Sequence, residues 1–257
     1  ISRSSSAHAI ISLSTSSIMT KDQPLLRLCA KLQAFFHKPF FTNPRTLFGL
    51  WTLLAVVAGL TKMAPHRHNN FLIFRGVFWH TIQKLSLYDF YPTEYNDHNH
   101  YGPIFSLVIA PFAVVPDAIG LLGWLVVLAL GMYYAVRRLP LEEGRQIFLY
   151  WFCAHELLTA LQMQQFNIAI AAIIIGSFAA IEKGREVTAA FLIVLGTFVK
   201  LYGVVGLAFF FFVKRKPRFI LALIGWSVVC FVAPMLISSP EYVVGQYVEW
   251  YERLAAK

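Results

Sequence analysis

Apolar segments of roughly membrane-spanning length recur along most of this chain. They comprise residues 47–60, 118–136, 146–163, 167–181, 187–213 and 219–237. A bilayer core offers no water to exposed backbone groups, so a spanning segment of about 20 apolar residues is helical. Charged residues make up 14% of the chain, against roughly a quarter in soluble domains. The sequence therefore predicts an all-α, polytopic transmembrane helical bundle.

Lys200 is the only charged residue in the run 187–213, and it stands at the midpoint. Insertion scales put the cost of a lysine at the bilayer centre at roughly 2.5–3.5 kcal/mol, and such residues usually face a cavity, a partner or the membrane surface. The run is therefore either one long helix with a buried functional lysine or two shorter helices that break at Lys200.

The distribution of Lys and Arg favours the break, because basic residues collect on the cytoplasmic side of membrane proteins. The favoured arrangement has the N-terminus inside, a break at Lys200 and a short apolar stretch, 104–115, that dips without crossing. It places fifteen Lys and Arg on the inner face, and the other combinations place at most thirteen there. The net charge of +9 thus reflects topology, and we expect no nucleic-acid partner. The fifteen are Arg3, Lys21, Arg27, Lys31, Lys38, Arg45, Arg137, Arg138, Arg145, Lys183, Arg185, Lys214, Arg215, Lys216 and Arg218.

This topology gathers three polar features at the outer face, and it predicts a site there. The first is the long loop 62–102, in which apolar residues three or four apart between Phe71 and Leu85 indicate an interfacial helix. The second is the polar turn 162–167. The third is Lys200 with its neighbour Tyr202.

The second half of the loop, 87–103, combines carboxylates, amides and aromatic rings. Sugar-binding sites use this mixture, because aromatic faces cover apolar ring edges while carboxylates and amides bind hydroxyls. The alternative is a solvated loop with an aromatic belt at the headgroups. Five histidines also lie in residues 62–102. His-x-His pairs without a placed carboxylate or cysteine are weak metal signals, and we expect no metal site.

The polar turn joins two apolar segments and contains Gln162, Gln164, Gln165 and Asn167. Such residues cap helix ends or pair with neighbouring helices. A cluster this dense exceeds what capping needs, so the pattern favours substrate contact by Gln162, Gln165 and Asn167.

Several short motifs, taken in order, resemble glycosyltransferase family 87 of the GT-C superfamily, whose members use polyprenyl-phosphate sugars. The resemblance covers residues 69–247 and implies a GT-C-type bundle whose long first extracytoplasmic loop carries interfacial helices. It also implies inverting transfer of a hexosyl or pentosyl residue to an envelope glycan or lipid, at the outer face of the bacterial inner membrane. The motifs are Tyr101-Gly102-Pro103, the stretch 111–116, Gln165-Phe166-Asn167, and Lys200-Leu201-Tyr202.

The resemblance further implies a general base on the loop that accepts the proton of the acceptor hydroxyl. Asp89, Glu94 and Asp97 are the candidates, with Asp89 and Asp97 foremost. The family commonly has an aspartate just after the first helix, where this chain has Asn70. An amide is not a general base, so either a loop carboxylate replaces it, or Asn70 only binds sugar, or the protein is inert.

A departing phosphate needs a cation, and the resemblance implies that Lys200 supplies it, with Arg75 as a second candidate. The expected partners are therefore the lipid-linked donor, a glycan or glycolipid acceptor and the bilayer, and no cofactor is expected. Two other classes stay open. A transporter or flippase would use Lys200, Glu156 and the glutamines as a path and predicts internal repeats, of which we find none. A non-catalytic membrane subunit would use polar residues to join helices.

Residues 1–18 are serine-rich and are expected to be a disordered or artefactual leader. Residues 19–257 are expected to form one transmembrane domain that is truncated at its C-terminal end. Within it, residues 24–38 predict an amphipathic helix on the inner surface, and residues 240–254 predict an interfacial helix.

Overall fold

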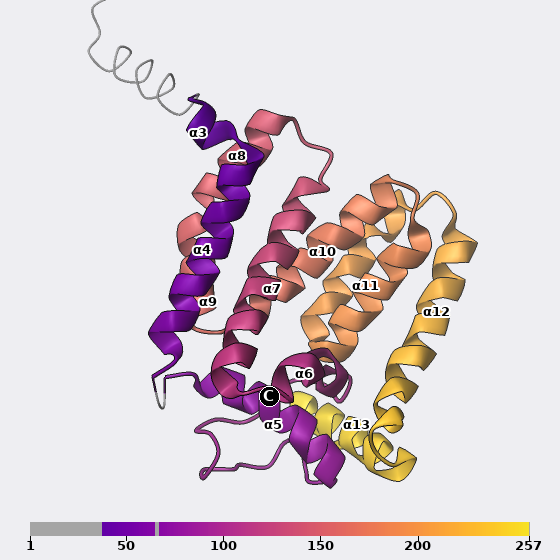
Figure 1. The fold of residues 1–257 in the computed structure, drawn as a ribbon. Helices are drawn as coiled ribbons and strands as arrows, with labels where there is room; N and C mark the ends of the chain where they lie inside the picture. Colours follow the sequence, from indigo (N-terminus) through magenta and orange to yellow (C-terminus); the bar gives the residue numbers. More distant parts are fainter. Residues whose placement is uncertain (1–37, 65–66, 257) are drawn as a thin grey trace, which may run out of the picture. The chain divides into compact units, whose positions relative to one another are not determined.

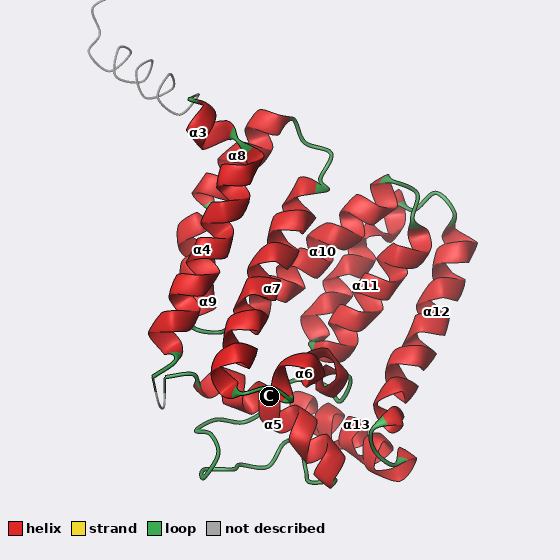
Figure 2. Cartoon of the chain, viewed as in Figure 1, coloured by secondary structure: helices red, strands yellow, loops and turns green. Residues whose placement is uncertain are grey.

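The computed structural model describes residues 38–64 and 67–256. The expected leader and nearly all of the amphipathic helix expected at 24–38 lie outside the described residues. Every regular element of the described part is helical, which confirms the all-α class (Figure 2). The chain divides into two units after Thr46, and the first contributes the short helix α3 (Pro39–Thr42) and the start of α4. The single domain expected for residues 19–257 stays a prediction.

The second unit is a bundle of apolar helices (Figure 1). Within the described residues, three helices are long and apolar enough to cross a bilayer: α4 (Pro44–Lys62), α7 (Asp117–Arg137) and Lys216–Leu236. The third consists of α12 (Lys216–Val232) and the 3-10 turn η2 (Ala233–Leu236) that continues it. The segment expected at 146–163 consists of two helices that meet at Cys153, α8 (Glu143–Phe152) and α9 (Ala154–Gln162). Two shorter apolar helices, α10 (Asn167–Glu182) and α11 (Glu186–Val199), follow.

The apolar run 187–213 is broken at Lys200, as the charge distribution predicts. Lys200 follows the last residue of α11 and is extended, with φ −150° and ψ 124°. The chain then returns along α11 as a 3-10 helix, η1 (Leu201–Phe212) (Figure 1). A 3-10 helix rises about 2.0 Å per residue, so this segment reaches roughly 24 Å, compared with roughly 18 Å for an α-helix of the same length.

Glycines set how closely η1 approaches the helices beside it. A 3-10 helix repeats every three residues, so Gly203, Gly206 and Phe209 lie on one ridge. A Cβ atom on Gly203 would overlap the backbone of Gly196, and one on Gly206 would lie 2.7 Å from Ile193 Cγ1. Further along the ridge, the ring of Phe209 packs against α10. The backbones of η1 and α11 are therefore closest next to Lys200, while bulky rings fill the space farther away.

Hydrogen bonds also join helices inside the apolar interior. The indole nitrogen of Trp51 donates to the carbonyl of Tyr150 at 3.1 Å, and the Tyr150 hydroxyl donates to the carbonyl of Tyr133 at 2.9 Å. The rings of Tyr133 and Tyr150 stack with centroids 4.7 Å apart. A polar group left without a partner in hydrocarbon costs several kcal/mol, so these bonds fix α4, α7 and α8 against one another.

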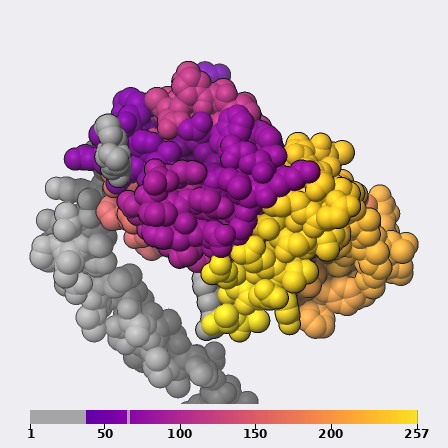
Figure 3. All heavy atoms as spheres, turned by 90° about the horizontal axis from the view of Figure 1, so that it is seen from below, coloured from indigo at the N-terminus to yellow at the C-terminus, as the bar shows by residue number. Residues whose placement is uncertain are grey.

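One end of the bundle is covered by three helices that do not cross it, α5 (Asn69–Gln83), α6 (Phe105–Ala113) and α13 (Pro240–Ala255) (Figures 1 and 3). The stretch 104–115 therefore does not span, as predicted, and α6 packs on α5. Most of α5 is buried, including Phe71 and Phe74, so it forms part of the core as well as of this surface. We call this the loop end, because it carries the loop 84–104.

The opposite end carries the turns between α7 and α8, between α10 and α11, and between η1 and α12 (Figure 1). We call it the basic end. Its cations are Arg137, Arg138, Arg145, Lys183, Arg185, Lys214, Arg215, Lys216 and Arg218. The order of the helices thus places the basic turns at one end of the bundle and the three polar features of the predicted site at the other end.

Candidate functional site at the loop end

Lys200 lies at the loop end, where its ammonium contacts an amide and two aromatic rings. Its Nζ donates a hydrogen bond to Oδ1 of Asn167 at 2.8 Å. The same atom lies 5.7 Å from the ring centroid of Tyr101 and 5.1 Å from that of Tyr202, within the range of cation–π attraction. Burial raises the pKa of Tyr101, which keeps its phenol neutral. The structure thus brings three predicted site residues together, Lys200, Asn167 and Tyr202.

The end of the long loop is attached directly to the break at Lys200. The backbone N–H of Gly102 donates to the carbonyl of Val199 at 3.0 Å. A Cβ on Gly102 would overlap the carbonyl oxygen of Phe198 and would lie 3.1 Å from the Trp250 ring. Only glycine allows this close approach, which explains the glycine between Tyr101 and a proline. The loop and the helix break therefore occupy fixed positions relative to each other.

The polar turn between α9 and α10 is held by Gln164, which the sequence analysis did not assign to substrate. Gln164 has a φ of 49°, a region that non-glycine residues seldom adopt. Its buried side chain donates to the carbonyls of Arg67 at 3.3 Å and Gln162 at 3.0 Å. Oε1 of Gln165 accepts a long hydrogen bond, 3.5 Å, from the amide of Asn167. Gln162 thus contributes its carbonyl to the turn, and Gln165 orients the amide that contacts Lys200.

The first turn of α5 connects this polar turn to the loop. The amide of Asn70 donates to the carbonyl of Met163 at 2.8 Å, and Oδ1 of Asn69 accepts from the backbone N–H of Asn96 at 2.8 Å. Asn70 therefore lies beside the polar turn, where its side chain acts as a hydrogen-bond donor.

The loop carboxylates are held in different surroundings. Asp89 is exposed, and its Oδ1 lies 3.6 Å from the guanidinium of Arg253 on α13. Asp97 is also exposed, and its Oδ1 accepts the backbone N–H of His98 at 2.7 Å. Because Asp97 directly follows Asn96, it stands on the α5 side of the loop, whereas Asp89 stands on the α13 side. Glu94 lies 3.1 Å from the buried imidazole of His80.

Arg75 contacts a different group of residues from those around Lys200. Its guanidinium forms an ion pair with Asp117 and donates to the carbonyl of Ala113 at 3.1 and 3.3 Å. Partial burial lowers the pKa of Arg75 from its usual value, and arginine stays protonated nonetheless. Asp117 was not among the site residues predicted from the sequence. The available signal was its position, the first residue of α7 after Pro116, where the helix dipole favours a carboxylate.

Helix α13 fastens the other side of the loop through contacts that the sequence analysis also missed. Glu249 accepts hydrogen bonds from the hydroxyl of Ser86 at 3.0 and 3.1 Å. Oε1 of Gln246 accepts the buried backbone N–H of Leu87 at 2.7 Å. Figure 3 shows the loop and α13 side by side across this face. The interfacial helix predicted at 240–254 is thus a support for the loop.

An apolar cavity of about 200 Å³ lies between α6, α7, α10 and α11. Its wall includes Trp124, Phe166 and Val199, the last of which precedes Lys200. Phe166 also packs against Tyr101, with ring centroids 5.6 Å apart. The Nε1 of Trp124 is buried without a hydrogen-bond partner among the described residues. An apolar space therefore adjoins the residues around Lys200.

In the described part of the chain, no group of three or more His, Cys, Asp or Glu side chains is placed to bind a metal ion. The Lys200 ammonium and the amides beside it suit an anionic or hydroxyl-bearing ligand.

Comparison with known proteins gives one match. Residues 99–257 match the family model described as glycosyltransferase family 87. The matched range is more than half of the chain and includes Tyr101, Asn167 and Lys200. Neither the curated proteins nor the solved structures gave a match.

Proposed function

The chain belongs to glycosyltransferase family 87 and is thus a membrane glycosyltransferase, and from this premise we propose that it transfers a sugar from a polyprenyl-phosphate donor to an envelope glycan or lipid. One observation supports the donor class above all others. Lys200 directly follows Val199, which lines the apolar cavity beside Trp124. A phosphate joined to an isoprenoid chain requires a cation and an apolar channel side by side.

In the proposed reaction, Lys200 binds the phosphate of the donor. The acceptor hydroxyl attacks the anomeric carbon, and the bond from that carbon to the phosphate oxygen breaks. The electron pair leaves with polyprenyl phosphate, whose added charge the Lys200 ammonium stabilises. Attack from the face opposite the leaving group inverts the anomeric configuration. Asn167 and Gln165 position the ammonium, and Tyr202 and Tyr101 provide aromatic faces beside it.

We assign the general base to Asp97 in preference to Asp89. Asp89 is paired with a guanidinium on α13, whereas Asp97 accepts a hydrogen bond from the adjacent backbone N–H. Asp97 also stands on the side of the loop that α5 connects to the polar turn. Asn70, a hydrogen-bond donor there, binds a sugar hydroxyl together with Gln162. No cofactor enters this scheme.

Arg75 receives a positioning role in this scheme. Its guanidinium is committed to Asp117 and to a carbonyl of α6. It therefore holds α5 against α6 and α7, and the phosphate is assigned to Lys200.

The orientation follows from the separation of charges. The basic end carries the turns rich in Lys and Arg, and such turns face the cytoplasm. The loop end then faces outward from a bacterial inner membrane, where the polyprenyl-linked sugar and the envelope acceptor meet. The N-terminus of the chain lies on the cytoplasmic side.

The experiment is transfer of labelled sugar from a polyprenyl-phosphate donor by the full chain in liposomes, compared with Lys200→Met. The variant keeps the length of the side chain and removes its charge. Removing one preorganised donor to a developing anion costs roughly 10²–10³ in kcat, and we expect a fall of that size. Lys200→Arg is expected to keep part of the activity, and Lys214→Met, in an exposed turn of the basic end, all of it.

Two results would overturn parts of this proposal. A rate for Lys200→Met within about twofold of the unaltered protein removes the lysine from the mechanism. An absence of transfer from every polyprenyl-phosphate sugar, with transfer from a nucleotide sugar, removes the donor class.

A further inference from the structure

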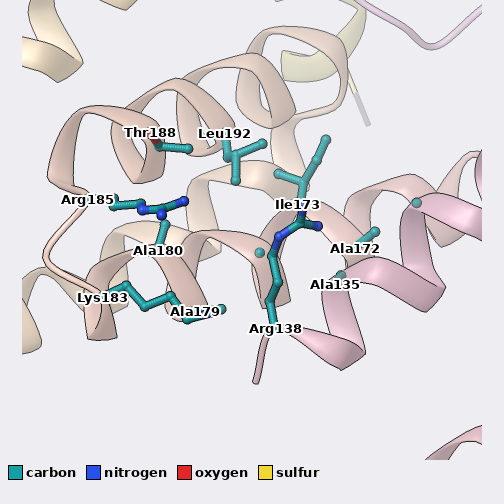
Figure 4. A pocket seen from close by; sticks show the side chains of 12 residues that line it. Ala135, Arg138, Ala172, Ile173, Ala179, Ala180, Lys183, Arg185, Thr188 and Leu192 are labelled. Atoms are coloured by element: carbon teal, nitrogen blue, oxygen red, sulfur yellow. The ribbon is translucent and has the colours of Figure 1, made fainter. Parts of the chain in front are cut away.

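A second cavity, of about 400 Å³, opens at the basic end between α7, α10 and α11 (Figure 4). This is the volume of an ordinary small-ligand pocket. Its walls are mostly small and apolar, and Lys200, Asn167 and Tyr202 are not among the residues that line it. The wall consists of Gly131, Ala135, Ala172, Ile173, Gly176, Ala179, Ala180, Thr188 and Leu192.

Three cations surround the mouth of this cavity, Arg138, Lys183 and Arg185. Figure 4 shows the guanidinium groups of Arg138 and Arg185 directed into the opening from opposite sides. Within the described residues none of the three takes part in an ion pair, and Arg138 makes one long hydrogen bond, 3.4 Å, to a carbonyl of its own helix. The nearby carboxylate of Glu186 is bonded to Arg215. The mouth therefore presents positive charge that suits an anion.

The apolar wall continues from this mouth toward the other end of the bundle. Gly131, Ala172 and Ile173 line both this cavity and the smaller one beside Trp124. Gly131 has open space where a Cβ would stand. The two cavities therefore adjoin along α7 and α10, and we call them together the groove, which is cationic at one end and apolar along its length.

We propose that this groove binds an anionic phospholipid, with the phosphate among Arg138, Lys183 and Arg185 and one acyl chain along the small residues. A soluble anion would use the cations but leave the apolar wall exposed. A zwitterionic lipid would fill the wall but bring its own cation to a cationic mouth. The end of a membrane-spanning bundle is also the level at which lipid headgroups lie, and basic pockets between helices there bind anionic headgroups.

The test measures lipid bound to the full chain in detergent, by native mass spectrometry with phosphatidylglycerol as the probe. We expect phosphatidylglycerol to bind, phosphatidylcholine to bind much more weakly, and inorganic phosphate not to displace the lipid. Substitution of both arginines, Arg138→Gln and Arg185→Gln, is expected to weaken phosphatidylglycerol binding about thirtyfold, from the usual contribution of two surface cations. Arg145→Gln removes an exposed arginine of the same end and is expected to change nothing.

A second substitution tests the acyl chain separately from the charges. Gly131→Leu adds a side chain at a lining position where a Cβ has open space, and we expect it to exclude the lipid while the protein stays folded. Gly225→Leu is the matched control, because its position on α12 also has open space but lies outside both cavities.

The proposal is overturned if phosphatidylcholine binds as tightly as phosphatidylglycerol, or if inorganic phosphate displaces the lipid. It is equally overturned if the double arginine variant or Gly131→Leu retains the lipid at the affinity of the unaltered protein.

Discussion

At the scale of single residues, two aspartates of one loop differ in their neighbours. Asp89 faces α13 and lies 3.6 Å from Arg253, while Asp97 accepts an N–H from its own backbone segment. A general base must reach a hydroxyl that arrives from outside the protein. Asp97 lies on the side of the loop that faces α5 and the polar turn, and it has no arginine partner among the described residues. The different neighbours of the two aspartates therefore predict different effects of their substitution.

Asp97→Asn is expected to lower kcat by roughly 10²–10⁴, the usual contribution of a positioned base, with little change in KM. Asp89→Asn is the matched control, since it makes the same change of charge and shape on the same loop, and it is expected to stay within a few fold. Both are measured as initial rates of sugar transfer at saturating donor. A larger loss in Asp89→Asn than in Asp97→Asn contradicts the assignment.

Part of this site could be predicted from sequence and part could not. Lys200 was predictable because a single charge in an apolar run has an energetic cost that only a few topologies relieve. Asn167 followed because the same topology brings the polar turn to the same end. Gln246 was not predictable, since its partner lies on another element and no local pattern marks a residue that bonds across 159 positions.

At the scale of elements, the hairpin of α11 and η1 fixes the position of Lys200. The distribution of Lys and Arg predicted the break but not the 3-10 geometry, because a uniformly apolar run has the same composition in either helix. The spacing of Gly203 and Gly206 does not distinguish the two helices, because residues three apart share a face in both. The three-residue repeat places both glycines against the neighbouring helices, where side chains would collide.

Gly203→Ala is expected to destabilise the protein by about 1–3 kcal/mol, the usual effect of excess volume in a packed interior. Its Cβ would overlap the backbone of Gly196, which has no freedom to move aside. Gly49→Ala on α4, where a Cβ has open space, is the control. We expect it to stabilise the helix by roughly 0.5–1 kcal/mol. Thermal unfolding in detergent measures both, and equal effects would show that the close approach is not needed.

At the scale of the whole bundle, the loop end depends on parts of the chain that are distant in sequence. The loop is bonded to α5 on one side, to α11 at Gly102, and to α13 through Gln246 and Glu249. The site therefore forms only when these distant helices are packed together. Hydropathy and charge predicted which segments share an end, and side-chain packing decided which residues touch.

Gln246→Ala is expected to release the loop without unfolding the bundle. It leaves the buried N–H of Leu87 without its acceptor, at a cost of roughly 1–3 kcal/mol. Hydrogen exchange should quicken in residues 84–104 and stay unchanged in α7 and α10, and sugar transfer should slow. Glu252→Ala, an exposed position of the same helix, is expected to leave both readouts unaltered. Unchanged exchange in the loop after Gln246→Ala would contradict this role of α13.

The bond between Ser86 and Glu249 joins residues 163 positions apart, and this separation has a consequence in time. Ribosomes add about 5–20 residues per second, so a newly made loop waits on the order of 8–30 seconds before its partner helix exists. During that interval the loop has left the ribosome while the contacts that will fasten it have not been synthesised. The loop is therefore fastened only after this interval, in an order that synthesis itself sets.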